Sequence, residues 1–364
     1  MTISEICASF NINGKYLSCV EVPTGNINST FLVKYFRDGE EKEYIIQKIN
    51  KNVFKCPEEV MDNIVRVTEY VRERVEDKDL STRKFVLRAF TSRDKNLPFV
   101  IDDQGEYWRC YRFIPNSITY DTCDDLGIIE RAGSAFGKFQ SYLDGFNAST
   151  LNIAIPDFHN TIKRYEALRT AIEKDVLGRA KNAKEEIDAV FAFEEKVCLL
   201  QKYLDQGKIP LRVTHNDTKC NNVSFDKDTG EALAVLDLDT VMPGAIAYDF
   251  GDAIRFIANT VIEDHPVIED VGLDLEKYQA FAKGFVSEVK NNLTDLEKQT
   301  INVGVLAMTV ELAVRFLTDY VNGDVYFKTR YPGHNMDRTR NQIALAKDID
   351  KKFAKMQQIL QKYV

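Results

Sequence analysis

The spacing of hydrophobic residues changes about a hundred residues into the chain, from the alternation typical of strands to the spacing typical of helices. Alternation predicts strands at residues 15–22, 29–36, 44–49, 85–90, 99–101 and 106–113. Between them, residues 57–76 form an amphipathic helical pattern, with Val60, Ile64, Val67 and Val71 on one side. The change of spacing predicts an N-terminal lobe, residues 1–115, and a C-terminal lobe, residues 116–364.

The second part of the chain is predicted to be mainly helical. Three helical patterns follow one another between residues 124 and 206, and the last of them covers residues 184–205. Later helices are expected at residues 248–259, 275–290, 294–320 and 334–364. We expect the aromatic residues of the first three helices in the core, and we interpret His159 as a packed or surface histidine rather than a catalyst.

A strand, a polar loop and a hairpin occupy residues 211–239. The short strand ending at Thr214 leads into a loop that runs from His215 to Asn222. Two apolar stretches separated by a turn follow, and the second of them ends at Asp237. A hairpin of this kind would bring Asp237 back beside the Asn222 end of the loop.

The polar residues of this segment match the needs of phosphoryl transfer, which requires a carboxylate near the attacking hydroxyl and oxygen ligands for Mg²⁺. His215, Asp217 and Asn222 have the spacing of a kinase catalytic loop. In such a loop Asp217 would face the acceptor hydroxyl, Asn222 would bind one metal position, and Asp237 would hold the other. Each residue alone is also common in turns, but their order on strand ends favours the catalytic interpretation.

A second candidate metal motif, Asp-Phe-Gly, begins at Asp249. It opens a helical pattern and lies well beyond the hairpin, whereas Asp237 is one hairpin away from Asn222. We therefore interpret Asp249 as an N-cap or a loop anchor.

The first two predicted strands have the layout of a nucleotide-covering hairpin. Gly25 in the turn could let the backbone approach a phosphate, and Asn28, Ser29 and Thr30 could add donors. Turns also contain glycine for backbone reasons alone, so both interpretations stay open.

The third strand of a kinase sheet normally carries a Lys that contacts phosphates and pairs with a Glu on the next helix. Here Gln47 and Lys48 face opposite sides of that strand. Lys48 is either a phosphate contact or a solvated lysine. Gln47 is a polar residue that could stand at the position where other kinases have the Lys.

Several stretches resemble the aminoglycoside phosphotransferase and choline kinase superfamily, and within it the bacterial N-acetylhexosamine 1-kinases. They are Arg212-Val213-Thr214-His215-Asn216-Asp217-Thr218-Lys219, Leu236-Asp237-Leu238-Asp239-Thr240-Val241-Met242-Pro243-Gly244, Ala132-Gly133-Ser134-Ala135-Phe136-Gly137 and Arg315-Phe316-Leu317-Thr318-Asp319-Tyr320. The similarity runs through most of the chain. It implies an α+β, bilobal protein-kinase-like fold with a small β-rich N-lobe and a larger, mainly helical C-lobe.

The resemblance also implies ATP and Mg²⁺ as cofactors. It implies that the anomeric hydroxyl of GlcNAc or GalNAc is phosphorylated, with Asp217 orienting this hydroxyl and accepting its proton. Asp239 would either assist with metal or cap the following loop. Arg315 and Tyr326 would contact the sugar, whereas Arg315 by itself requires only a partner, either a structural carboxylate or a ligand. The residues implied for the nucleotide are Gly25, Asn28, Ser29, Thr30, Gln47 and Lys48, with a hinge at Arg112, Phe113 and Ile114.

Two other functions stay open on the residues. The same chemistry could act on choline, homoserine or an aminoglycoside, although a cationic acceptor would need an acidic or aromatic pocket. A kinase-fold nucleotide-binding protein without catalysis would have lost the base or a metal ligand, and here Asp217, Asn222 and Asp237 are all present.

The composition is that of an ordinary globular protein, with 364 residues, 44% hydrophobic and 29% charged. A net charge of −8 argues against nucleic acid and anionic membranes as partners. Seven scattered cysteines and four histidines make a zinc site an unlikely feature and suit a reducing cytoplasm. No signal peptide or long apolar run is visible, so we expect a cytoplasmic protein. We also expect a monomer whose partners are ATP and a small sugar.

Overall fold

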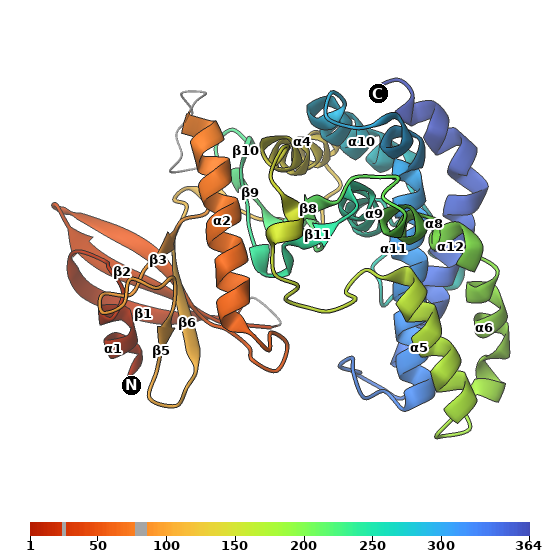
Figure 1. Cartoon of the computed structure of the whole chain (residues 1–364), viewed down its shortest axis with the longest axis horizontal. Helices are drawn as coiled ribbons and strands as arrows, with labels where there is room; N and C mark the ends of the chain where they lie inside the picture. Colours follow the sequence, from red (N-terminus) through yellow and green to blue (C-terminus); the bar gives the residue numbers. More distant parts are fainter. Residues whose placement is uncertain (24–26, 77–85) are drawn as a thin grey trace. The chain divides into compact units, whose positions relative to one another are not determined.

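The computed structural model describes residues 1–23, 27–76 and 86–364 (Figure 1). These residues form two compact units, each built from segments that are not consecutive in the chain. The N-terminal unit contains Met1–Ile118, Thr150–Pro156 and Ser224–Met242. The C-terminal unit contains Thr119–Ser149, Asp157–Val223 and Pro243–Val364. The hairpin that carries Asp237 therefore belongs to the unit built mainly from the first 118 residues.

An antiparallel sheet forms most of the N-terminal unit. Its strands are β1 (Lys15–Val22), β2 (Ser29–Arg37), β3 (Glu40–Lys48), β4 (Ala89–Phe90), β5 (Val100–Ile101) and β6 (Tyr107–Arg112). Their order is β1-β2-β3-β6-β4, and β5 also pairs with β6. Each predicted range contains a strand within its described residues, but of 85–90 only Ala89–Phe90 is strand, and β3 begins earlier than expected. Asp38 and Gly39 both have positive φ and form a two-residue turn, so Arg37 of β2 pairs directly with Glu40, where β3 begins.

Alternate side chains of the sheet form one hydrophobic cluster. It includes Val33 of β2, Tyr44 and Ile46 of β3, and Cys110 of β6, together with Ile6 of α1 (Ile3–Ala8). The face opposite this cluster is left for polar side chains, because neighbouring residues of a strand point to opposite sides.

Two further elements complete the N-terminal unit. The helix α2 (Pro57–Glu76) has the predicted bounds, and Val60, Ile64, Val67 and Val71 are all buried as expected (Figure 1). A small sheet in the order β10-β9-β7 is formed by β7 (Ser117–Ile118), β9 (Val223–Asp226) and β10 (Ala232–Val235).

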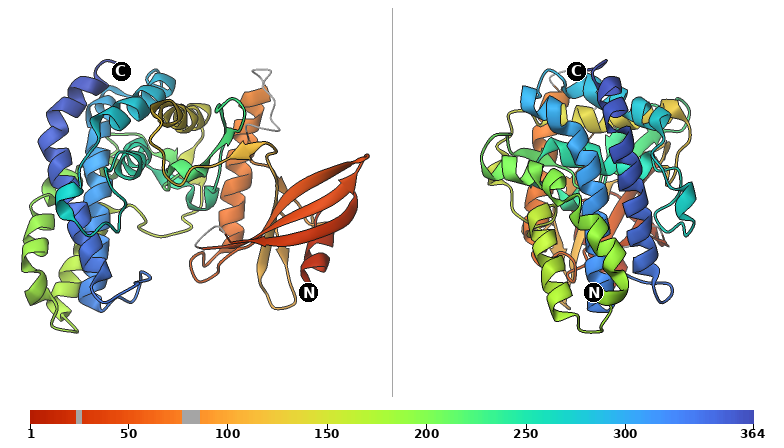
Figure 2. Two further views of the ribbon diagram at one scale, coloured as in Figure 1. Left: turned by 180° about the vertical axis from the view of Figure 1, so that it is seen from behind. Right: turned by 90° about the vertical axis from the view of Figure 1, so that its right-hand side faces the viewer.

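The C-terminal unit is a layered set of helices. The long ones are α4 (Leu126–Tyr142), α5 (Thr161–Lys174), α9 (Ile246–Ile257), α10 (Leu275–Val289), α11 (Asp295–Asn322) and α12 (His334–Leu360). Helix α4 packs on α10, while α11 packs on α9, α5 and α12, which runs beside it (Figure 2). The short strand β8 (Arg212–Thr214) pairs with β11 (Met242–Gly244).

The single helix predicted at residues 184–205 is wrong. Three short helices replace it: α6 (Lys184–Phe191), α7 (Glu194–Val197) and α8 (Leu199–Asp205). The hydroxyl of Tyr165 donates to the carbonyl of Val190 at 2.7 Å, and Phe193 N bonds the same carbonyl at 3.2 Å. A side chain that enters the helical hydrogen-bond ladder interrupts it, which ends α6 at this point.

Helix α11 is long and apolar enough to cross a membrane by length and composition. However, 89% of its apolar stretch is buried against other elements. It is therefore the core helix of the C-terminal unit.

Candidate active site

The predicted catalytic loop follows β8 in the C-terminal unit, and a buried aspartate holds its shape. Asp249 of α9 accepts the backbone amides of His215 and Asn216, each at 2.8 Å. Gln140 of α4 donates to the same carboxylate at 2.6 Å. Asn216 has φ 65°, a left-handed conformation that needs such support. The loop-anchor interpretation of Asp249 is thus confirmed, and the N-cap alternative is wrong because α9 is capped at Ala245.

Two neighbours hold the carboxylate of Asp217. The ammonium of Lys219 lies 2.8 Å from its Oδ1. Asn222 Nδ2 donates to its Oδ2 at 3.1 Å and to its backbone carbonyl at 2.8 Å. The side chain of Asp217 is still 29% exposed, so it is fixed in place and open to a ligand.

Asn222 fits a magnesium site through the orientation of its amide. Both of its hydrogen bonds to Asp217 come from Nδ2. Its Oδ1 therefore points away from Asp217, and an amide oxygen is a ligand that Mg²⁺ accepts. The carboxylate of Asp237 has the same chemistry, but Asp237 belongs to the N-terminal unit. The described residues contain no group of three or more acidic, His or Cys side chains that could hold a metal. The metal roles of Asn222 and Asp237 stay predictions.

His215 lies beneath the catalytic loop. Its ring is fully buried, with ring-centroid distances of 5.6 Å to Phe136 and 6.2 Å to Phe139. Its Nδ1 accepts the backbone amide of Asp217 at 3.2 Å. These contacts shape the loop, and the catalytic role predicted for His215 stays a prediction.

An ion-pair chain continues from the loop into α9. Thr218 N donates to Asp252 at 3.0 Å, and Arg255 Nη2 lies 2.8 Å from the other oxygen of that carboxylate. Burial opposes the charge of Lys219, but Asp217 and Asp252 outweigh it and raise the Lys219 pKa. Lys219 is therefore a cation that faces the carboxylate of Asp217.

A buried His–Glu pair stands behind Asn216. His159 Nδ1 lies 2.9 Å from Glu311 of α11, and His159 Nε2 lies 3.2 Å from the carbonyl of Asn216. Both ring nitrogens face acceptors, and this geometry favours a hydrogen on each of them. Burial works against the positive charge of such a ring, yet Glu311 and Asp252 prevail and the His159 pKa is raised. His159 is a packed histidine, as predicted, and it supports the residue next to Asp217.

One turn of α11 beyond Glu311, Arg315 has two aromatic rings as neighbours. Its guanidinium carbon lies 5.7 Å from the ring centre of Phe158 and 5.5 Å from that of Phe327. Within the described parts of the chain, no carboxylate forms an ion pair with Arg315, so the structural-carboxylate alternative has no candidate there. Tyr326, in the same loop as Phe327, is 71% exposed.

Two buried polar atoms near Arg315 also lack a hydrogen-bond partner. They are Glu311 Oε2 and Arg164 Nε, while Arg164 Nη2 donates to the carbonyl of Phe158 at 2.7 Å. Burial and the nearby charge of Arg315 lower the Arg164 pKa. Buried polar groups without a partner are costly and rare, so a ligand that supplies the missing bonds would be favoured here.

In the N-terminal unit, the polar face of the sheet carries a network centred on Arg109. Arg109 Nε donates to Gln47 Oε1 at 3.0 Å, and Gln47 Nε2 donates to Thr30 Oγ1 at 3.0 Å. The guanidinium also binds both oxygens of Asp239, with Nη2 at 2.9 Å. Asn28 Nδ2 donates to Asp239 Oδ2 at 2.7 Å. Four of the predicted residues thus meet, around an arginine that was not predicted.

The remaining nucleotide residues lie around the same sheet. Lys48 pairs in register with Ser29 and is half-buried, on the face opposite Gln47. At the hinge, Arg112 N donates to the carbonyl of Arg88 at 3.0 Å and Phe113 N donates to that of Glu43 at 3.3 Å. Ile114 is buried in an apolar cluster with Leu233, Ala234 and Leu236. Gly25 lies outside the described residues.

Three residues that sequence reasoning passed over are close to predicted ones. Arg109 could have been noticed as a charge within the apolar strand from Tyr107 to Arg112. Lys219 stands two residues after Asp217, a spacing that permits contact around the loop. Glu311 could have been noticed as a carboxylate one helical turn before Arg315 in an apolar helix, because this spacing places both side chains on the same face.

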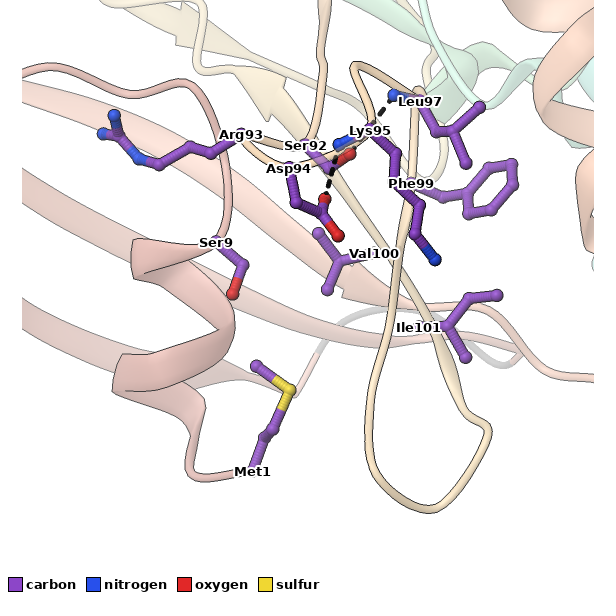
Figure 3. A pocket seen from close by; sticks show the side chains of 10 residues that line it. All are labelled: Met1, Ser9, Ser92, Arg93, Asp94, Lys95, Leu97, Phe99, Val100 and Ile101. Atoms are coloured by element: carbon purple, nitrogen blue, oxygen red, sulfur yellow. Dashed lines mark hydrogen bonds between the residues drawn. The ribbon is translucent and has the colours of Figure 1, made fainter.

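The N-terminal unit also has a surface hollow of about 340 Å³, formed by the start of the chain, the turn at Asp94 and Lys95, and β5 (Figure 3). None of the predicted site residues lines it. It is therefore separate from the network around Arg109.

The chain was compared with known protein families. The model of the phosphotransferase enzyme family matches residues 18–281, which is more than half of the chain. The chain belongs to this family. The matched range includes the sheet network and the catalytic loop with Asp217 and Asn222, and it ends before Arg315 and Tyr326.

Solved structures with the same fold are distant in sequence. Choline kinase from Cryptosporidium parvum Iowa II is 14% identical, with a TM-score of 0.55, and the match covers 96% of this chain and 93% of that one. Spectinomycin phosphotransferase, solved with ADP and spectinomycin, is 14% identical with a TM-score of 0.54, over 98% and 97%. Ethanolamine kinase from Plasmodium vivax is 12% identical with a TM-score of 0.52, over 96% and 86%. The predicted α+β, protein-kinase-like fold is confirmed.

Proposed function

We propose that this phosphotransferase uses ATP and Mg²⁺ to phosphorylate the anomeric hydroxyl of an N-acetylhexosamine, GlcNAc or GalNAc. The observation that carries the acceptor assignment is Arg315, a half-buried guanidinium between two aromatic rings with no carboxylate paired to it among the described residues. The motif resemblance to N-acetylhexosamine 1-kinases supports the same acceptor.

The reaction assigned to the catalytic loop is a direct transfer. The anomeric oxygen of the sugar bonds to the γ-phosphorus of ATP, the bond from that phosphorus to ADP breaks, and Asp217 accepts the hydroxyl proton. Lys219 and Asn222 keep the Asp217 carboxylate oriented. Asn222 Oδ1 and the Asp237 carboxylate would hold Mg²⁺, which when bound neutralises charge on the phosphates.

The charges around Arg315 favour a neutral acceptor over a cationic one. Arg315 and Arg164 are two guanidinium groups near each other, and the carboxylates that act on Arg164 are Glu311 and Asp157. One carboxylate oxygen of Glu311 is already paired with His159. Choline and aminoglycosides carry cationic groups that the guanidinium of Arg315 would repel, whereas sugar hydroxyls and an acetyl oxygen can accept from arginine.

The deciding experiment is a coupled ADP-release assay with GlcNAc, GalNAc, glucose, choline, homoserine and an aminoglycoside as acceptors. We expect turnover with the two N-acetylhexosamines at least about tenfold above the others, a difference of about 1.4 kcal/mol. Turnover of choline or an aminoglycoside above that of the hexosamines would reject the acceptor assignment. Absence of ADP release with every acceptor, with ADP still bound, would favour a non-catalytic nucleotide-binding protein.

A further inference from the structure

Among the described residues, the ion pair that a kinase sheet normally uses does not occur at its usual place. That pair joins a third-strand Lys to a Glu on the following helix. Here β3 has Gln47 at the polar position, and on α2 the four glutamates with described side chains, at positions 58, 59, 69 and 73, are all exposed. Among the described side chains of α2, the buried polar residues are Asn63 and Thr68, and Asn63 donates to the carbonyls of Val241 and Asn152.

A different buried ion pair occupies the polar face of the same sheet. Arg109 lies directly opposite Gln47 in the pairing of β3 with β6, so their side chains share that face. Arg109 is 1% exposed and Asp239 is 4% exposed. The guanidinium binds both carboxylate oxygens of Asp239, while Gln47 and Asn28 take part at the edges.

This pair connects the sheet to the turn that follows β10. Asp239 lies in the 3-10 turn Leu238–Thr240, which begins directly after Asp237. Asp237 itself has φ 54°, a conformation that a non-glycine residue keeps only when its surroundings hold it. Bidentate arginine–carboxylate bonds fix both distance and orientation, so Arg109 restrains the turn next to Asp237.

Buried ion pairs are seldom the most stable way to fill a protein interior, because both charges lose their hydration. Two apolar residues of similar volume at positions 109 and 239 would stabilise the fold at least equally. A buried ion pair on the polar face of this sheet is therefore better explained by fixed geometry than by stability.

We propose that Arg109 is a positioning residue for magnesium binding, acting through Asp239 on the carboxylate of Asp237. It replaces the strand-to-helix Lys–Glu pair by a strand-to-turn Arg–Asp pair, with the cation moved one strand along the sheet. The inference rests on the proposed function, in which Asp237 is a Mg²⁺ ligand.

The test measures ADP affinity by calorimetry in EDTA and in excess Mg²⁺, for the full chain and its variants. We expect Mg²⁺ to tighten ADP binding by the parent. In Arg109→Met this Mg²⁺-dependent gain should shrink by about tenfold or more, as outer-shell changes typically do, while the ADP affinity in EDTA stays within about twofold. Arg109→Lys should be intermediate, because one ammonium cannot reproduce the bidentate geometry.

Two further variants separate positioning from simple stability. Arg212→Met removes a partly buried guanidinium that binds both oxygens of a carboxylate, Glu297, in the C-terminal unit. It should lower the melting temperature and leave the Mg²⁺-dependent gain unchanged. The double change Gln47→Lys with Arg109→Met places a cation opposite the lost one, and it should recover part of the gain.

The outcomes distinguish the inference from the function beneath it. A parent whose ADP affinity ignores Mg²⁺ overturns both. If Mg²⁺ tightens ADP binding equally in the parent and in Arg109→Met, only the role of Arg109 is overturned. The role of Arg109 is also overturned if Arg212→Met loses as much of the Mg²⁺-dependent gain as Arg109→Met does. If Arg109→Met does not fold, the same ADP titrations are made with Asp239→Asn. This variant can keep the hydrogen bond from Asn28 but loses the negative charge. An undiminished Mg²⁺-dependent gain in ADP affinity in Asp239→Asn rejects the inference.

Discussion

At the scale of single residues, the carboxylate of Asp217 is oriented before any ligand arrives. Lys219 and Asn222 hold its two oxygens at 2.8 and 3.1 Å. Asp217→Asn preserves the shape but removes most of the basicity, and base assistance is worth roughly 10² to 10⁴ in rate. We expect kcat to fall by at least about a hundredfold with ADP affinity little changed. Parent-like turnover would remove Asp217 from its proposed role.

Asp237 and Asp249 should fail in different ways. Asp237→Ala removes a proposed Mg²⁺ ligand, so we expect activity to be lost with the melting temperature near that of the parent. Asp249→Ala leaves the amides of His215 and Asn216 and the Gln140 amide without their buried acceptor. Each unsatisfied group costs about 1–3 kcal/mol, so the melting temperature should fall clearly. Metal dependence that follows Asp249 instead would reverse the two assignments.

Arg315 and Tyr326 test the acceptor pocket. Lys lacks the fork of Arg, so Arg315→Lys should raise the hexosamine KM and leave the ATP KM within about twofold. Tyr326→Phe should weaken the acceptor by about 1 kcal/mol, the worth of one hydrogen bond. The two KM values are measured in the same ADP-release assay. Unchanged hexosamine kinetics in both variants would make Arg315 a structural residue.

At the scale of elements, glycines allow two pairs of helices in the C-terminal unit to approach closely. A Cβ on Gly304 of α11 would lie 1.9 Å from the carbonyl oxygen of Ala247 in α9. On Gly284 of α10 it would lie 2.0 Å from that of Glu130 in α4. Helix α9 carries Asp249, so its distance from α11 helps to set the catalytic loop.

Gly304→Ala should therefore force α9 and α11 apart. Overpacking of this kind costs about 1–3 kcal/mol, so the urea midpoint should fall and turnover should fall with it. Gly127→Ala is the matched control, because its Cβ would meet only the flexible ends of Asp125 and Arg131, at 3.1 Å or more. Equal midpoints for the two variants would contradict the tight packing of α9 on α11.

At the scale of the whole molecule, the His159–Glu311 pair makes stability depend on pH. The His159 pKa is raised above its ordinary value of 6.5 because Glu311 and Asp252 outweigh burial. A raised folded pKa means that the stabilisation is complete below about pH 6.5 and is lost as the pH rises through the folded pKa. Urea midpoints measured from about pH 6 to about pH 9 should fall for the parent, and His159→Gln should lack this component. An identical slope in both proteins would show that His159 is not the titrating group.

The sequence by itself determined most of the elements and the order of the candidate catalytic residues. The bounds of β1 and α2 and the buried face of α2 follow from periodicity, which is a local property of the chain. The grouping of Asp217 with Asn222 follows from loop spacing for the same reason. A local interruption was missed where Tyr165 reaches in from another helix to end α6.

Only the tertiary structure decided which distant side chains support these residues. Arg109 and Asp239 are 130 positions apart, and His159 and Glu311 are 152 apart. The sequence allows Asp249 to be a helix cap or a loop anchor, and the structure shows that it accepts the amides of a loop more than thirty positions earlier. Hydrophobic periodicity says which face of an element is buried, but the partner of a buried charge is set by how the elements pack against one another.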